Sequence, residues 1–141
     1  MTRSRNPTTV AKYFSGALAA LVLAGCAGMQ TGGTPEQVVR KRAAERAEAF
    51  VKGDMPRSYA FTTPSFRKLR DEAAYARAFG GGVKWQKAEV RLVTCEAQRC
   101  VVQMAVTANP LIPKMIGDTI TVQFEETWLQ EDGNWWLHPA L

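Results

Sequence analysis

The sequence predicts an α+β domain over residues 34–141, in which one long helix and two short helices pack on a curved antiparallel sheet of about four strands. Two observations predict this class. Between residues 34 and 79, apolar residues recur at helical spacing, whereas from residue 83 onward they alternate with polar residues at a period of two. Short connections join only antiparallel strands, so the sheet is expected to be a meander.

The first 25 residues have the layout of a secretion signal. Arg3, Arg5 and Lys12 are the only charged side chains in this stretch, and a short apolar segment follows at residues 13–25. That segment is too short, and too rich in glycine and alanine, for a transmembrane helix, which needs about 20 apolar residues. We therefore expect a signal peptide that is removed.

The apolar segment ends in Leu23-Ala24-Gly25-Cys26, which resembles the lipobox of bacterial lipoproteins. The resemblance implies that the chain is cut before Cys26, whose thiol carries a diacylglyceryl group and whose amine is often acylated as well. Several acyl chains anchor a protein firmly, because each buried methylene adds about 0.8 kcal/mol. Ala27 stands where aspartate acts as a retention signal, which implies an outer-membrane lipoprotein facing the periplasm. Residues 26–33 are then the lipidated cysteine and a glycine-rich, flexible tether.

The long helix is predicted to begin after Thr34, which caps it, with Pro35 in the first turn and Gln37 completing a capping box. It ends at Lys52-Gly53. Its apolar residues form one stripe, namely Val39, Ala43, Ala47, Phe50 and Val51. The charged residues between them are most simply a solvent-exposed face, and they include Arg40, Lys41, Arg42, Glu45, Arg46 and Glu48.

Two short helical segments follow. Asp54 begins the first, Thr63-Pro64 indicates a capped turn, and Asp71 begins the second, which ends at Gly80-Gly81-Gly82.

The strand half contains three alternating segments and a final hairpin. Asp132-Gly133 indicates the tight turn before Trp135-Trp136, whose two side chains must point to opposite faces of the sheet. The apolar residues of the three segments are Ala88, Val90 and Leu92, then Cys100, Val102, Met104 and Val106, then Ile120, Val122 and Phe124.

The segment 111–116, Leu-Ile-Pro-Lys-Met-Ile, is too apolar for an ordinary exposed loop. It is expected to fold over the domain's own core, or else to contact a partner, a second copy or the bilayer.

Cys95 and Cys100 flank four residues at the tip of the first predicted hairpin, where a disulfide can join them. Export would place them in an oxidising compartment. The alternatives are metal ligation and a redox pair. The only histidine, His138, is far away in the sequence, and redox pairs usually have the spacing C-x-x-C, so a structural disulfide is favoured. We expect no metal site and no cofactor.

The net charge of +5 does not indicate nucleic-acid binding. Without the three basic residues of the signal segment, 15 basic and 13 acidic residues remain. No basic stripe is interleaved with aromatic residues that could stack on bases.

Three features together resemble the nuclear transport factor 2-like superfamily, which includes ketosteroid isomerase and polyketide cyclases. They are the helix end at Gly53-Asp54, the stretch Ser58-Tyr59-Ala60-Phe61-Thr62-Thr63-Pro64-Ser65-Phe66-Arg67, and the ending Trp128 to Asp132-Gly133-Asn134-Trp135-Trp136. The resemblance covers about residues 34–141 and implies a cone-like roll with an apolar cavity. Either this cavity is lined by some of a set of eight residues, or their side chains fill the space and leave no cavity. The set is Tyr59, Phe66, Tyr75, Phe79, Trp85, Met104, Phe124 and Trp128.

The chemistry of the isomerase does not carry over to this sequence. That enzyme places a tyrosine and two carboxyls in its cavity, whereas here Glu89, Glu125 and Glu126 are expected on or beside exposed strand faces. No catalytic triad or phosphate-binding loop is present in the sequence.

We therefore predict a non-catalytic binding or adaptor module. Its expected partners are the membrane, through the lipid, and a hydrophobic small ligand, an envelope protein or a second copy. The alternatives are an isomerase- or cyclase-type enzyme acting on a small apolar substrate, and a structural component of an envelope assembly.

Overall fold

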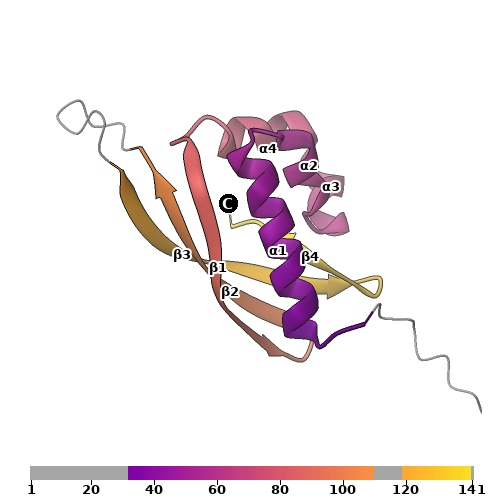
Figure 1. Cartoon of the computed structure of the whole chain (residues 1–141). Helices are drawn as coiled ribbons and strands as arrows, with labels where there is room; N and C mark the ends of the chain where they lie inside the picture. The colour runs from indigo at the N-terminus through magenta and orange to yellow at the C-terminus, as the bar shows by residue number, and fades with distance from the viewer. Residues whose placement is uncertain (1–31, 110–118, 141) are drawn as a thin grey trace, which may run out of the picture.

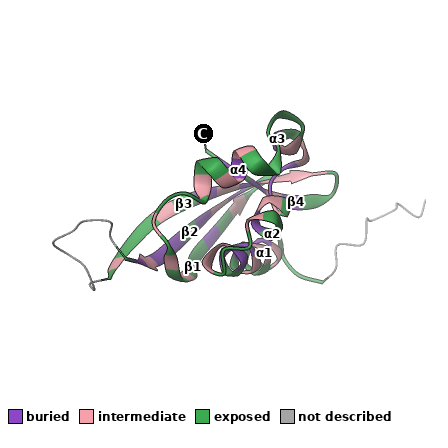
Figure 2. Ribbon diagram, turned by 90° about the horizontal axis from the view of Figure 1, so that it is seen from above, coloured by how far each residue is buried: buried purple, intermediate pink, exposed green. Residues whose placement is uncertain are grey.

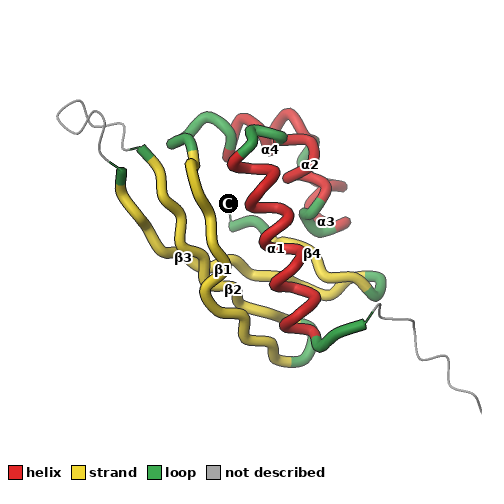
Figure 3. The backbone as a smooth tube through the Cα atoms, viewed as in Figure 1, coloured by secondary structure: helices red, strands yellow, loops and turns green. Residues whose placement is uncertain are grey.

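The computed structural model describes residues 32–109 and 119–140. Four helices lie on one side of a four-stranded antiparallel sheet whose strand order, β1-β2-β3-β4, is the order of the chain (Figure 1). The tube view shows α1 (Pro35–Val51) crossing the curved sheet, with the three short helices gathered at one end of α1 (Figure 3). The predicted α+β class is confirmed. The predicted signal segment, Cys26 and the apolar segment 111–116 lie outside the described residues.

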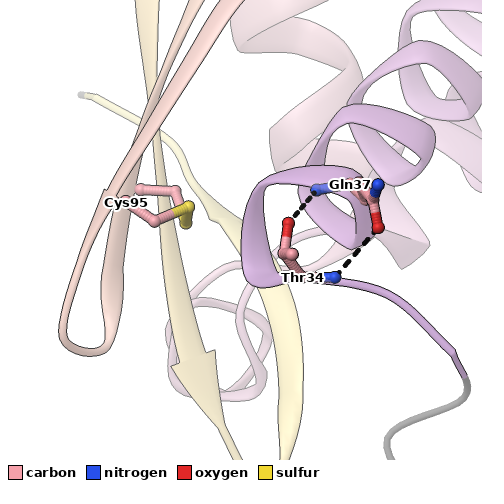
Figure 4. Close-up of a disulfide and its surroundings, with 4 residues drawn as sticks. Thr34, Gln37 and Cys95 are labelled. Atoms are coloured by element: carbon pink, nitrogen blue, oxygen red, sulfur yellow. Dashed lines mark hydrogen bonds between the residues drawn. A yellow bond between two sulfur atoms is a disulfide. The ribbon is translucent and has the colours of Figure 1, made fainter.

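Helix α1 begins as the sequence predicts. The backbone N–H of Gln37 donates to the hydroxyl of Thr34 at 3.4 Å, and the backbone N–H of Thr34 donates to the side-chain oxygen of Gln37 at 3.0 Å (Figure 4). These two bonds satisfy N–H groups that the first turn of a helix leaves free. Gly53 follows the helix with φ of +74°, a left-handed conformation that glycine adopts without strain. Within the described residues, none of the helices is long and apolar enough to span a bilayer.

Three short helices, rather than two, follow α1. They are α2 (Met55–Ala60), α3 (Pro64–Leu69) and α4 (Glu72–Phe79). Each begins with a side-chain cap, because Asp54, Thr63 and Asp71 accept hydrogen bonds from backbone N–H groups three residues later. The pair Thr63-Pro64, which was expected to make only a capped turn, therefore begins a complete helix of six residues.

The first hairpin joins β1 (Trp85–Glu96) to β2 (Arg99–Ala108). Its register places Cys95 directly opposite Cys100, and a disulfide joins them, as their spacing predicts (Figure 4). The register shifts between Val90 and Leu92. Beyond this bulge, Val93 is buried and Leu92 is 49% exposed, so the prediction that Leu92 shares the inner face with Val90 was wrong.

The second hairpin joins β3 (Ile120–Glu131) to β4 (Asn134–His138). Trp135 is buried and Trp136 is half-buried, consistent with their predicted positions on opposite faces. The outer edge of β4 is covered by the connection between α2 and α3. The N–H of Leu137 donates to the carbonyl of Phe61 at 2.8 Å, and the N–H of Thr63 donates to the carbonyl of Leu137 at 2.9 Å.

The core lies between α1 and the inner face of the sheet, where Figure 2 shows buried residues along β2. The buried residues of the cluster are Val39, Ala43, Ala47, Val93, Cys100, Val102, Met104, Trp128, Trp135 and Leu137.

Candidate functional site

A pocket of about 430 Å³ lies where the end of α1, α4, the start of β1 and the middle of β3 meet. Residues 137–140, which are the last two residues of β4 and the two that follow it, form another part of its wall. Aromatic rings supply much of the lining, and they belong to Phe50, Tyr75, Phe79, Trp85 and Phe124. The polar part of the wall contains Arg46 and Glu126, with Glu125, Thr127 and His138 nearer the solvent.

The structure brings four of the predicted cavity residues to this pocket: Tyr75, Phe79, Trp85 and Phe124. The other four lie elsewhere. Met104 and Trp128 are fully buried in the core, and Phe66 is the buried residue of α3. Tyr59 uses its hydroxyl to donate to the carbonyl of Arg70 at 2.7 Å. The ring of Tyr75 connects the two sets, because it packs against Tyr59 and Phe66 outside the pocket and against Phe79 within it.

The rings that line the pocket pack on one another only in part, so they leave space between them. Phe50 and Trp85 have ring centroids 4.3 Å apart, and Trp85 and Phe124 have centroids 5.6 Å apart. Phe50 was predicted as part of the apolar stripe of α1 but not as a cavity residue. Its place at the last turn of α1 puts its ring beside the start of β1.

A buried ion pair forms the polar wall of the pocket. The Nη1 of Arg46 donates to Oε1 of Glu126 at 2.5 Å, and the two side chains are 6% and 5% exposed. The other carboxylate oxygen of Glu126 accepts from the indole N–H of Trp128 at 3.1 Å. Both oxygens of the carboxylate are therefore engaged, which is what a buried charge requires.

The ion pair continues into a chain of hydrogen bonds toward α2. The Nη2 of Arg46 donates to the hydroxyl of Tyr75 at 3.2 Å, and this hydroxyl lies 2.9 Å from the hydroxyl of Ser58. Ser58 and Tyr75 are both buried. The chain thus links α1, α2, α4 and β3, and it fixes the guanidinium of Arg46 at the pocket wall.

Two opposing effects act on the pKa of Arg46. Burial lowers it, whereas the charge of Glu126 and the interactions with Tyr75 raise it, and the net direction is upward. The guanidinium is consequently cationic. Its carbon lies 5.0 Å from the ring centroid of Phe50 and 5.5 Å from that of Trp85, within the range of cation–π attraction.

The predictions that placed Arg46 on a solvent-exposed face and Glu126 on or beside one were wrong. Both residues had a local signal. Positions 39, 43, 46 and 50 have the alternating spacing of four and three that defines one helix face, and Arg46 is on it. Glu126 has the same parity as Phe124 and Trp128, so it faces inward with them. Glu89 and Glu125 are exposed, as predicted.

A second arginine of α1, Arg42, lies one turn before Arg46 and outside the pocket. Its Nε donates to the carbonyl of Trp135 at 2.6 Å, and its guanidinium carbon lies 4.8 Å from the ring centroid of Trp136. Arg67 approaches the same ring at the same distance. Burial, together with the charge of Arg67, lowers the pKa of Arg42 although Glu45 opposes this shift. Arg42 is half-buried rather than exposed, which corrects its prediction as well.

A histidine, His138, also lines the pocket. His138 is exposed at the pocket, and its strand partner in the register is Thr127. Among residues 32–109 and 119–140, no group of three or more histidine, cysteine, aspartate or glutamate residues could hold a metal ion. The two charged side chains of the inner wall, Arg46 and Glu126, form an ion pair with each other.

Comparison of the sequence with protein-family models and with curated proteins gives no match. Solved structures do match. A SEC-C motif containing protein from Rhodopseudomonas palustris superposes with a TM-score of 0.54 at 18% identity, covering 75% of this chain and 76% of that one. A second SEC-C motif containing protein, from Psychrobacter arcticus, has a TM-score of 0.56 at 15% identity, covering 77% of this chain and 63% of that one.

A protein described as NTF2-like and of unknown function, from Burkholderia pseudomallei, also matches. Its TM-score is 0.41 at 22% identity, covering 67% of this chain and 82% of that one. At these identities, the two likenesses with TM-scores above 0.5 show a shared fold and carry no information about activity.

Proposed function

We propose that this protein is a lipid-anchored envelope protein with an NTF2-like domain that binds a small, mostly apolar molecule in the pocket without transforming it. The observation that carries the proposal is the pocket itself. Among the residues that the structure describes, five aromatic side chains line it, and the charged groups of its inner wall, Arg46 and Glu126, neutralise each other. A volume of about 430 Å³ falls within the range of pockets that hold small organic ligands.

The burial of apolar surface supplies the binding free energy. Each square ångström of apolar ligand surface removed from water contributes about 25 cal/mol, before the entropic cost of association is subtracted. Rings such as Phe79 and Phe124 offer flat apolar surfaces for this contact.

The state of Glu126 argues for binding without turnover. A general base must have an oxygen free to take a proton from the substrate. Here one oxygen of Glu126 accepts from Arg46 and the other accepts from Trp128, and proton uptake would leave the buried arginine without its counter-ion.

The anchor belongs to the same proposal. With a lipid on Cys26, a tether of seven residues (27–33) could at its longest hold the domain roughly 25 Å from the bilayer. Ala27 favours the outer membrane and a periplasmic domain. Metabolic labelling with a fatty-acid analogue should mark the wild type and not Cys26→Ser, and equal labelling of the two would refute the lipid anchor.

Binding is tested with N-phenyl-1-naphthylamine, a neutral apolar dye that fluoresces when buried. Ala78 lines the pocket and Ala73, on the same helix, does not, so Ala78→Trp and Ala73→Trp are a matched pair. We expect saturable binding to the wild type and Ala73→Trp, and at least tenfold weaker binding to Ala78→Trp. Equal binding to both variants would show that the dye does not occupy this pocket. Native mass spectrometry of protein purified from its own envelope would then identify the natural ligand.

The second candidate is an isomerase- or cyclase-type enzyme, and the burial of Glu126 at the pocket favours it. If Glu126 acts as a base, Glu126→Gln should bind substrate and fail to convert it. A β,γ-unsaturated ketone reports such activity, because its isomerisation produces an absorbing conjugated enone. Conversion by the wild type that is lost in Glu126→Gln would replace the binding proposal with the enzymatic one.

A further inference from the structure

One donor at the pocket wall has no partner. Among the side chains that the structure describes, Nε of Arg46 is the single buried nitrogen or oxygen without a hydrogen bond. The two terminal nitrogens of the same guanidinium are occupied by Glu126 and Tyr75. A buried donor left unpaired is unfavourable and uncommon in folded proteins, so each case requires a physical explanation.

The surroundings of this donor connect it to the pocket. Arg46 itself lines the pocket, and so do Phe50 and Trp85, whose rings lie over its guanidinium. Both rings are only half-buried. If a ligand in the pocket moved the ring of Phe50 or Trp85 aside, the atoms of the ligand would reach the guanidinium of Arg46.

The charges at this wall select a neutral ligand group. The positive charge of Arg46 is already balanced by Glu126, and Glu125 adds a negative charge nearer the solvent. A ligand carboxylate or phosphate would therefore meet no excess positive charge, while its desolvation would be costly. A neutral acceptor loses less on leaving water and needs only one donor.

We propose that the ligand of this pocket carries one neutral hydrogen-bond acceptor, such as an ester or amide oxygen or an aromatic ring nitrogen, that accepts from the Nε–H of Arg46. The inference rests on the proposed binding function and specifies its ligand class. A pocket lined only by hydrocarbon would bind two ligands of the same shape equally, whereas the Nε–H of Arg46 favours the ligand that has an acceptor.

Naphthalene and quinoline test this discrimination, since they have nearly the same shape and quinoline alone has an acceptor nitrogen. Affinities are measured from the change in tryptophan fluorescence for the wild type, Arg46→Lys and Arg42→Lys. Lysine keeps the positive charge beside Glu126 and lacks Nε. We expect the affinity of quinoline relative to naphthalene to fall about tenfold in Arg46→Lys, the worth of one hydrogen bond to a charged donor. The affinity of quinoline relative to naphthalene should be unchanged in Arg42→Lys, because Arg42 lies outside the pocket.

A ratio that is the same in the wild type and Arg46→Lys would overturn this inference and leave the binding function intact. Failure of both compounds to bind the wild type would overturn the binding function as well. A second measurement needs no variant. The Nε–H proton signal of Arg46 in the wild type should shift downfield with quinoline and not with naphthalene, and equal shifts would contradict the proposal even if Arg46→Lys fails to fold.

Discussion

Arg42 and Arg46 stand one turn apart on α1, and the sheet gives them different partners. Arg46 meets a carboxylate, is buried, and has its pKa raised in net, although burial itself acts to lower that pKa. Arg42 meets a backbone carbonyl and aromatic rings, stays half-exposed, and has its pKa lowered, chiefly by burial. The difference shows that burial of an arginine alone disfavours its charge, and that the opposing strand decides whether this cost is offset.

The largest effect is expected when the carboxylate is removed. Glu126→Ala leaves Arg46 buried without a counter-ion, which should lower the free energy of unfolding by about 3–5 kcal/mol. Urea denaturation measures this loss. The double variant Arg46→Met/Glu126→Leu removes both charges and should recover most of the stability. If Glu126→Ala loses no more stability than Arg42→Met, the two arginines contribute equally, which would contradict the comparison.

The hydroxyl of Tyr75 should have the next largest effect. Tyr75→Phe keeps the ring but removes the group that contacts Arg46 and Ser58, and we expect a loss of about 1–2 kcal/mol. Tyr59→Phe is its control, because that hydroxyl bonds a single carbonyl at an exposed position. Equal losses in urea denaturation would mean that the buried chain adds nothing to the stability of the ion pair.

Replacing Arg42 should cost less. Arg42→Met keeps much of the packing against Trp136 but loses one hydrogen bond and the cation–π contacts with Phe61 and Trp136, so about 1 kcal/mol should be lost. Thermal unfolding with and without added salt checks the mechanism. Because Arg42 is in no salt bridge of the described residues, its contribution should change little with salt.

The smallest effect belongs to an exposed pair at the end of the same helix, Glu48 and Lys52. The hydrogen bond from Lys52, followed by its charge, lowers the pKa of Glu48. The resulting stabilisation is present above the unfolded-state pKa of glutamate and is lost as the pH falls through the lower folded-state pKa. Melting temperatures of the wild type and Lys52→Met should therefore differ slightly at neutral pH and converge in acid. A difference that grows in acid would reverse this sign.

Local signals were sufficient for most of the fold. The capping box at Thr34, the change of period at residue 83 and the turn at Asp132-Gly133 each depend on neighbours in the sequence, and each is present in the structure. The bulge in β1 could not be predicted in this way. Leu92 and Val93 are both apolar, so either could face inward, and only the pairing with β2 selects Val93.

The site was harder to predict than the fold, because its central contact joins residues 80 positions apart. Helix spacing and strand parity could have placed Arg46 and Glu126 on inward faces, but neither signal shows that these faces oppose each other. Charged residues are usually exposed, and that general preference outweighed the local pattern in the prediction.

The strand order of the sheet has a consequence for how the protein reaches its native state. Each strand pairs with its neighbour in the chain, and the cysteines of the first hairpin are separated by only five positions, so these contacts close short loops and can form early. The pocket depends on the longest loops, because it joins the first helix to residues 137–140. A partly folded or proteolysed domain can thus retain its hairpins and its disulfide while the pocket is absent, and binding of the proposed ligand would report that the whole domain has closed.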